Sequence, residues 1–176
     1  SEDKSKPDAT GLFKGPGTSR FVWTQRLDLV KTAQGGFNID MNGDVEGIYK
    51  GTTDADTATI TAQHVKAVTT PAPTSPAAQS EEVRNGLDLG ADLEIERLMA
   101  EGGVYISTPR RRVDCNLFDY NLSTGLARLD SAPGRTVSIL TEGSPTPVRA
   151  GSVLWNMDPA IDTITITNAQ GGSISP

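Results

Sequence analysis

The chain has 176 residues, which suits one domain or two small ones, and a chain of this size folds without a metal or a disulfide. Its 16 Lys and Arg residues against 22 Asp and Glu residues give a formal net charge of −6, which argues against nucleic acid and anionic membrane surfaces as partners. A single cysteine and a single histidine exclude an intrachain disulfide and a Cys/His zinc cluster. We expect no metal and no cofactor.

Residues 1–18 are polar and rich in Gly, Pro and Lys, and they predict a flexible arm. This arm lacks the apolar core of a signal peptide, and no apolar run in the chain reaches about 18 residues, so the sequence predicts neither a signal peptide nor a membrane-spanning helix. We expect residues 19–176 to form one domain.

Apolar and polar residues alternate with a period of two along much of the chain, which indicates half-buried antiparallel strands. The clearest such segments are 37–41, 57–62, 137–139 and 163–167. Turn-forming residues recur about every ten residues and predict an all-β sandwich, barrel or roll of about a dozen short strands. These turn signals are 34–36, 42–44, 123–125, 132–134, 158–160 and 170–172.

Residues 69–86 are rich in Pro, Ala and Ser and then become charged, which predicts a long loop or a linker. The two interpretations look identical in sequence. We favour a loop, because the roughly 50 residues before it would make a poor core alone.

Residues 91–101 fit either a helix or a strand. Leu93, Ile95, Val104 and Ile106 follow a period of two, interrupted at Gly102 and Gly103, and the neighbouring segments read as strands. We therefore predict a strand.

An internal repeat appears when the sequence is shifted by 35 residues, which lays Leu117–Leu129 over Ser152–Ile164. Each copy reads as a strand that ends in an aromatic residue and Asn, followed by a short turn and a second alternating strand. A weaker third copy is Arg26–Ile39. Repeated hairpins that cannot bury their apolar faces singly imply stacking into one elongated core.

The repeat resembles the OstA-like domains of the LptA and LptC family, which are periplasmic domains of lipopolysaccharide export. In that family an apolar-x-Ala-x-Gly-x-Val phrase is followed by a Tyr-Asp/Asn-x-x-Thr/Ser-Gly phrase. Leu98–Val104 supply the first phrase, Tyr120–Leu129 supply the second, and Val148–Asn156 repeat the opening. The resemblance spans roughly residues 20–175, and its N-terminal matches are Trp23, 43–45 and 59–65.

The resemblance implies an antiparallel β-jelly-roll built from repeated hairpins, with two sheets folded into a V (a "taco") around an apolar groove. It also implies a non-enzymatic carrier or bridge that binds lipopolysaccharide or another acyl lipid and joins homologous jelly-roll domains edge to edge. The implied location is the periplasm, with attachment to the inner membrane by a segment missing from this chain as a further option. The alternative is a carbohydrate-binding or surface-structural β-sandwich module.

An inward-facing apolar stripe is the candidate lipid-binding groove. The same side chains would serve equally as an ordinary sandwich core, and the sequence leaves both interpretations open. The stripe consists of Phe37, Ile39, Met41, Ile60, Leu98, Val104, Ile106, Leu117, Leu129, Val137, Ile139, Leu154, Ile164 and Ile166.

Arg110, Arg111 and Arg112 form the only dense basic cluster. Guanidinium groups bind phosphate well, so the cluster is a candidate contact to a lipid phosphate, although a solvated turn is the interpretation we favour.

Other single residues carry weaker signals. We interpret His64 as a surface or edge histidine and Cys115 as a small buried residue, because neither has a catalytic partner in the sequence. Trp23 and Trp155 are expected to plug the ends of the sandwich, with a carbohydrate-stacking platform as the alternative. Asp54 and Asp56, like residues 42–44, are expected to serve turns and not Ca²⁺ binding.

Overall fold

A computed structural model of the chain describes residues 17–53, 57–71, 87–88, 93–158 and 160–169. These residues contain eleven strands and no helix, and every pair of strands is antiparallel. The prediction of an all-β antiparallel fold is therefore confirmed. The strands are β1 (Thr18–Val22), β2 (Arg26–Lys31), β3 (Phe37–Lys50), β4 (Thr57–Pro71), β5 (Leu87–Asp88), β6 (Leu93–Ser107), β7 (Arg111–Asn121), β8 (Leu126–Asp130), β9 (Val137–Thr141), β10 (Val148–Asn156) and β11 (Ile164–Ala169).

All eleven strands belong to one hydrogen-bonded sheet in the order β11-β10-β8-β7-β6-β4-β3-β1-β5. β2 also pairs with β3, and β9 pairs with both β10 and β7. Six of the eleven strand pairs join strands that are consecutive in sequence, as hairpin turns produce, and the other five join strands farther apart along the chain. β4, which precedes residues 72–86, pairs directly with β6, which follows them after β5, so the two halves of the chain share one sheet.

A row of β-bulges crosses the long strands and bends the sheet. The pairing register shifts between Asn42 and Val45, between Thr61 and His64, and between Glu101 and Val104. Gly43 and Gly102 take φ values of 81° and 80° at these bulges, a backbone conformation that glycine adopts without strain. We call this row of bulges the crease.

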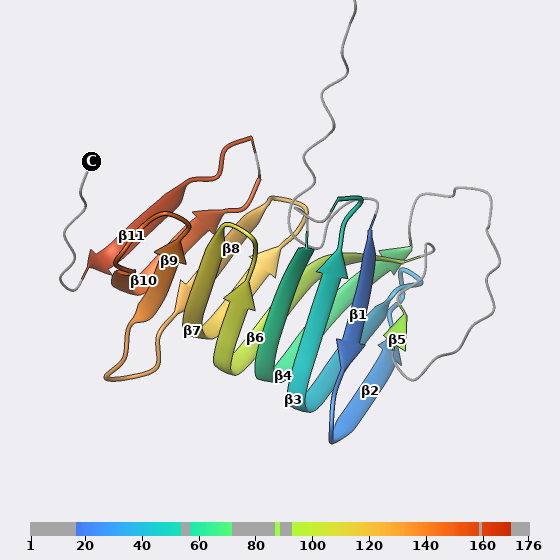
Figure 1. Cartoon of the computed structure of the whole chain (residues 1–176). Helices are drawn as coiled ribbons and strands as arrows, with labels where there is room; N and C mark the ends of the chain where they lie inside the picture. Colours follow the sequence, from blue (N-terminus) through green and yellow to red (C-terminus); the bar gives the residue numbers. More distant parts are fainter. Residues whose placement is uncertain (1–16, 54–56, 72–86, 89–92, 159, 170–176) are drawn as a thin grey trace, which may run out of the picture.

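The crease divides the sheet into two facing layers (Figure 1). The first layer consists of β1, β5 and β9 together with one half of each long strand: residues 45–50 of β3, 57–61 of β4, 104–107 of β6 and 111–115 of β7. The second layer consists of β2, β8, β11 and residues 152–156 of β10, together with the other halves of the long strands: residues 37–42 of β3, 64–71 of β4, 93–101 of β6 and 117–121 of β7.

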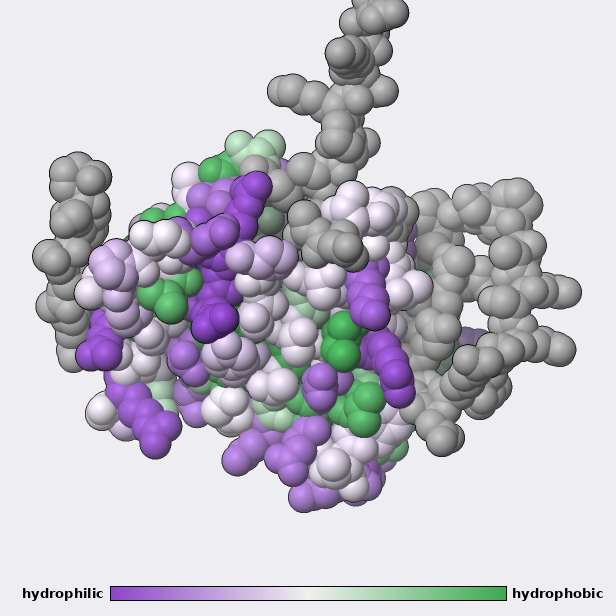
Figure 2. All heavy atoms as spheres, viewed as in Figure 1, coloured by the Kyte–Doolittle hydropathy of each residue, from purple (hydrophilic) through white to green (hydrophobic). Residues whose placement is uncertain are grey.

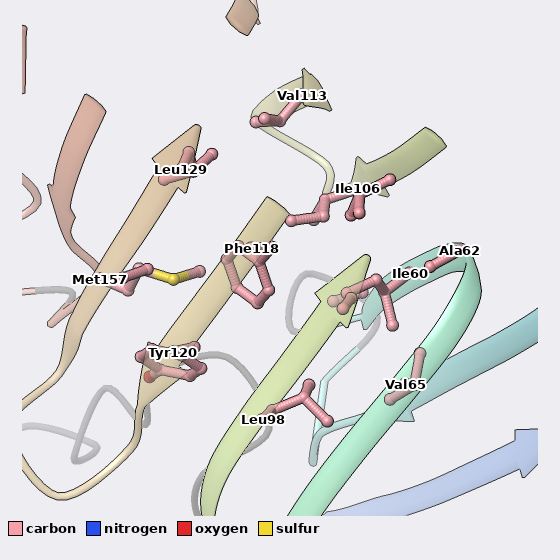
Figure 3. Packing of buried hydrophobic residues seen from close by; sticks show 14 of the residues in the cluster. Ile60, Ala62, Val65, Leu98, Ile106, Val113, Phe118, Tyr120, Leu129 and Met157 are labelled. Carbon is pink, nitrogen blue, oxygen red and sulfur yellow. The ribbon is translucent and has the colours of Figure 1, made fainter. Parts of the chain in front are cut away.

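The space between the layers holds the apolar core. Figure 3 shows Ile60, Ile106 and Val113 of the first layer and Leu98, Phe118 and Leu129 of the second pointing into it. All six side chains are fully buried. The opposite face of the first layer, seen in Figure 2, carries mostly hydrophilic and neutral side chains with scattered apolar ones. One apolar face on each strand is what the period of two predicts.

The predicted strand over residues 91–101 is confirmed from Leu93 onward as part of β6; residues 91 and 92 lie outside the described residues. The prediction of a turn at residues 42–44 is wrong, because these residues form a bulge inside β3 and the strand continues through them. The interruption expected at Gly102 and Gly103 is a bulge inside β6, which also continues through it. The prediction of only short strands is wrong for the same reason, since β3, β4 and β6 have 14, 15 and 15 residues.

The Pro-rich segment starts later than predicted, because β4 continues to Pro71 and Thr69 is buried in it. Residues 72–86 lie outside the described residues, as do 1–16 of the predicted arm, the pair Asp54 and Asp56, and the turn signal at 170–172. Thr18 of the predicted arm belongs to β1.

Candidate functional site

The interior between the layers is the candidate site, and nine residues of the predicted stripe line it. Each of the nine is at most 2% exposed, so the side chains pack against one another as in a sandwich core. An acyl chain would therefore have to replace some of these contacts. The nine are Ile39, Met41, Ile60, Leu98, Val104, Ile106, Leu129, Val137 and Ile139.

Three further stripe residues lie at the margins of the interior. Phe37 in β3 and Ile164 and Ile166 in β11 are partly buried and pack against the core. The two isoleucines belong to the last strand of the sheet, whose outer edge has no partner among the described strands. The interior thus reaches an open edge of the sheet at β11.

Two stripe residues were assigned to the wrong face. Leu154 is 44% exposed, and Leu117 is half-buried opposite Glu101 on the outer face. The inward positions of these strands are Phe118 in β7 and Val153 in β10, each next to the misassigned leucine. The side-chain period of a strand is two, so a frame shifted by one residue places a side chain on the opposite face.

The sequence interpretation also missed interior residues, the largest being Phe21, Tyr49, Phe118 and Tyr120. A signal for two of them was present in the repeat. The shift of 35 residues lays Phe118 over Val153 and Tyr120 over Trp155, and all four are buried. Reading the alternation from the aromatic residue before Asn would have given the correct frame.

The basic cluster divides into one buried and two exposed arginines. Arg110 and Arg112 are exposed, whereas the side chain of Arg111 is only 14% exposed. The Arg111 guanidinium donates to the carboxylate of Asp162 and lies over the Trp155 ring, 5.0 Å from its centroid. Arg111 is therefore paired within the chain, and the favoured interpretation of a solvated turn is wrong for this residue, whereas Arg110 and Arg112 are exposed as that interpretation expects.

Asp162, in the connection between β10 and β11, also accepts a hydrogen bond from Trp155 Nε1 at 3.1 Å. Burial alone would raise the pKa of Asp162, but the hydrogen bonds from Arg111 and Trp155, together with the charges of Arg111 and Arg110, outweigh it. The pKa of Asp162 lies below its usual value, so this carboxylate stays charged at neutral pH.

Trp155 is 4% exposed and its ring is covered by Arg111, so it cannot serve as a stacking platform for a sugar in this state. Trp23 is partly buried and packs against the core. Tyr120 lies in the same row of the second layer as Trp155, and burial, followed by the charge of Asp158, raises its pKa to about 12.

His64 lies on the outer face of β4, a central strand, and not at an edge of the sheet. Its Nε2 is 2.7 Å from Asp40 Oδ1 on β3, and its Nδ1 is 3.7 Å from Glu101 Oε2 on β6. Within the described part of the chain, no group of three or more His, Cys, Asp or Glu residues could hold a metal ion. In the same residues no helix has the length and apolarity needed to cross a membrane.

Two cavities lie along the crease and share Gly103. The larger, of about 410 Å³, is bordered by Asp44, Glu46 and Gln63 among others. The smaller, of about 150 Å³, is bordered by Cys115 and Arg135 among others. Both mark places where the bulges interrupt regular packing.

Cys115 is expected to react slowly with alkylating agents in the folded protein. Burial first, then the charges of Asp114 and Asp130, raise the pKa of its thiol from 9.0 to about 12. At pH 8.5 the reactive thiolate is thus about 10³-fold scarcer than in the unfolded chain, and iodoacetamide labelling followed by mass spectrometry should show a comparable rate ratio.

The same raised pKa affects stability. The unfolded thiol ionises near pH 9 and the folded thiol only near pH 12, so this contribution is full below pH 9 and is lost as the pH rises from 9 to 12. We expect Cys115→Ala to remove this part of the alkaline decline in denaturation experiments. Equal labelling rates for the folded and unfolded chains would contradict the burial of the thiol.

The folded sheet described above defines an LptA-like β-jelly-roll, all-β and antiparallel. The chain is similar in structure to LptH of Pseudomonas aeruginosa, which is described as the LptA-homologous periplasmic component of the conserved lipopolysaccharide transport device. The two share 13% sequence identity at a TM-score of 0.52, and the match covers 90% of this chain and 88% of LptH. No family model matches the sequence, and the search of curated proteins finds no relative.

Proposed function

We propose that this chain is a non-enzymatic carrier of acyl lipid in lipopolysaccharide transport, located in the periplasm. The observation that supports the proposal most is the jelly-roll shared with a lipopolysaccharide transport component over 90% of the chain. Attachment to the inner membrane by a segment outside this chain stays a prediction.

The interior has the chemistry that acyl chains need. Burial of each methylene is worth about 0.8 kcal/mol, so a chain of about 12 carbons gains roughly 10 kcal/mol when it leaves water. Ile39, Met41, Ile60, Leu98 and Ile106 offer an apolar lining from both layers. Since these side chains pack against one another, lipid entry requires the two layers to move apart.

The charged groups suit a lipid whose head stays outside. The exposed Arg110 and Arg112 lie next to the end of the interior near Trp155, where they can approach a phosphate. The net charge of −6 opposes deeper entry of an anionic head. The burial of Trp155 speaks against the alternative of a carbohydrate-binding module.

The two ends of the sheet suit edge-to-edge assembly with homologous jelly-roll domains. β2 has a partner on one side only among the described strands, and its Leu29 and Val30 are 46% and 60% exposed. β11 is likewise paired only with β10. Unpaired strand edges bind a further strand through backbone hydrogen bonds, so these edges are the proposed contacts.

The test of the proposed function is capture of a photoactivatable diazirine fatty acid by the purified chain, with peptide mapping of the label. We expect labelling on the inward residues of β3, β4 and β6, and we expect added lipopolysaccharide to reduce it. Labelling confined to outward residues, or none at all, would contradict the proposal.

A matched pair of variants on β4 sharpens this test. Ala67 is 1% exposed in the interior, whereas its neighbour Val68 faces outward. Ala67→Phe fills the interior and is expected to reduce capture several-fold, while Val68→Phe leaves it unchanged. Thermal unfolding of both variants controls for loss of the fold.

A further inference from the structure

The end of the interior that lies opposite the crease is called the mouth. Charged and aromatic side chains of the two layers meet there. Arg111 begins β7 in the first layer. Trp155 and Asp162 belong to the second layer and to the connection that follows it. The contact among these three residues therefore joins the layers across the mouth.

The register of the strands shows that the contact crosses the interior. Arg111 and Tyr120 lie nine residues apart on β7, which is about 30 Å in a straight strand. Tyr120 pairs with Ala127, and Ala127 pairs with Trp155, so Trp155 is two strand spacings, or about 10 Å, from Tyr120. Arg111 reaches Trp155 only because β7 bends at the crease and returns over the second layer.

No other ion pair between described residues joins the two layers across the interior. Arg97–Asp119 joins neighbouring strands of the second layer, and Arg128–Asp130 lies on a single strand. The pairs of His64 and Lys66 join β4 to its neighbours, and Arg26–Asp28 lies within β2. The Arg111–Asp162 pair is also less exposed on its arginine side than any of these, at 14%.

The contact among Arg111, Trp155 and Asp162 combines stabilising interactions with features that cost free energy. The ion pair, the Trp155 hydrogen bond and the guanidinium over the indole ring all hold it together. Against them, Arg111 Nε is buried without a hydrogen-bond partner, and Asp162 takes a positive φ of 39°. A buried donor without a partner costs free energy that opening would recover, because water could then reach it.

We propose that Arg111, Trp155 and Asp162 form a latch that holds the layers closed at this part of the mouth, and that its release gives acyl chains access to the interior. The identity of the ligand rests on the proposed function, whereas the closure of the mouth rests on the geometry alone. An anionic group of the lipid can replace Asp162 on the guanidinium, so the latch and the lipid head compete for the same cation.

The test measures opening and uptake separately. Spin labels at Glu142→Cys and Ala160→Cys, in a Cys115→Ser background, sit on exposed sites beside Arg110 and Asp162 in the two layers. Double electron–electron resonance reports their distance, and stopped-flow fluorescence of cis-parinaric acid reports acyl uptake. The latch variant is Asp162→Asn, and the matched control is Asp119→Asn, which breaks an ion pair within one layer.

Asp162→Asn is expected to shift the label distance to longer, broader values and to speed probe uptake about tenfold, while Asp119→Asn matches the parent in both. Arg111→Lys, which keeps the charge and loses the planar fork, should fall between them. Circular dichroism confirms folding of each variant.

An unchanged label distance in both Asp162→Asn and Arg111→Lys would overturn the latch. A longer distance without faster uptake, in a parent that binds the probe, would overturn its role in access. If the parent protein binds no probe at all, the proposed function fails, and the distance measurement still decides whether the latch exists.

Discussion

Replacing Phe118 with alanine is expected to lower the free energy of unfolding by about 3–5 kcal/mol. Phe118 is fully buried on β7, pairs with Ala100 and Leu129, and has its ring centroid 6.0 Å from that of Tyr120 (Figure 3). Its removal leaves a cavity where both layers converge, which the surrounding strands cannot fill without bending. Urea denaturation followed by tryptophan fluorescence measures the loss.

The matched control is Leu154→Ala, which removes an apolar side chain of the equivalent repeat that is 44% exposed. We expect a change within about 0.5 kcal/mol, typical of surface positions. If the two variants lost similar stability, the assignment of inward and outward faces in β7 and β10 would be wrong.

The second large effect is expected from Gly36→Ala in the turn between β2 and β3. A Cβ on Gly36 would lie 1.8 Å from the backbone oxygen of Thr69, which no side-chain rotation can relieve. Thr69 is buried, and its Oγ1 accepts a hydrogen bond from Phe37 N at 3.0 Å, so neither strand can move aside freely. We expect a loss of about 3 kcal/mol or more, measured by chemical denaturation.

Gly151→Ala is the control for this substitution. A Cβ there would lie 3.6 Å from its nearest neighbour, Asn168 Cβ, an ordinary contact. The variant should keep the parent's stability within about 0.5 kcal/mol. A Gly36→Ala protein as stable as Gly151→Ala would show that the β2–β3 turn does not pack on the end of β4.

Local chemistry made the hairpins predictable. Asn121 and Asn156 each follow a buried aromatic residue, and their side-chain oxygens accept backbone hydrogen bonds at 3.0 Å, from Ser123 N and Asp158 N respectively. Such Asx turns depend on residues two positions apart, so a short sequence window contains the whole signal. The aromatic-Asn step recurs in the repeat at 117–129 and 152–164, which a shift of 35 residues reveals in the sequence.

The bulges were not predictable from the same window. Asn42, Gly43 and Asp44 have the composition of a hairpin turn, yet β3 continues through them because β4 pairs on both sides of the irregularity. Local sequence cannot distinguish a turn from a bulge when the deciding hydrogen bonds come from a strand farther along the chain. The length of the strands and the position of the crease were missed together.

The latch was out of reach for a different reason. Arg111 and Asp162 are 51 residues apart, and their contact depends on the bend of β7 and on the β10–β11 connection at once. The three consecutive arginines suggested phosphate binding. Arg111 is the buried one because it shares the inward face of β7 with Val113, and that face is known only from the strand pairing. The apolar interior was predictable; what closes it was not.

The crease is the line along which the sheet bends most easily, because the register shifts of several strands lie there in one row. Register shifts interrupt the ladder hydrogen bonds there on β3, β4, β6 and β7, so these strands can bend at the crease while the pairing on either side is kept. β10, by contrast, passes from β9 in the first layer to β8 in the second without a register shift. A force that separated the layers would therefore work mainly against side-chain packing and the contacts at the mouth. The bulges thus give the sheet a line along which it could bend without loss of the strands on either side.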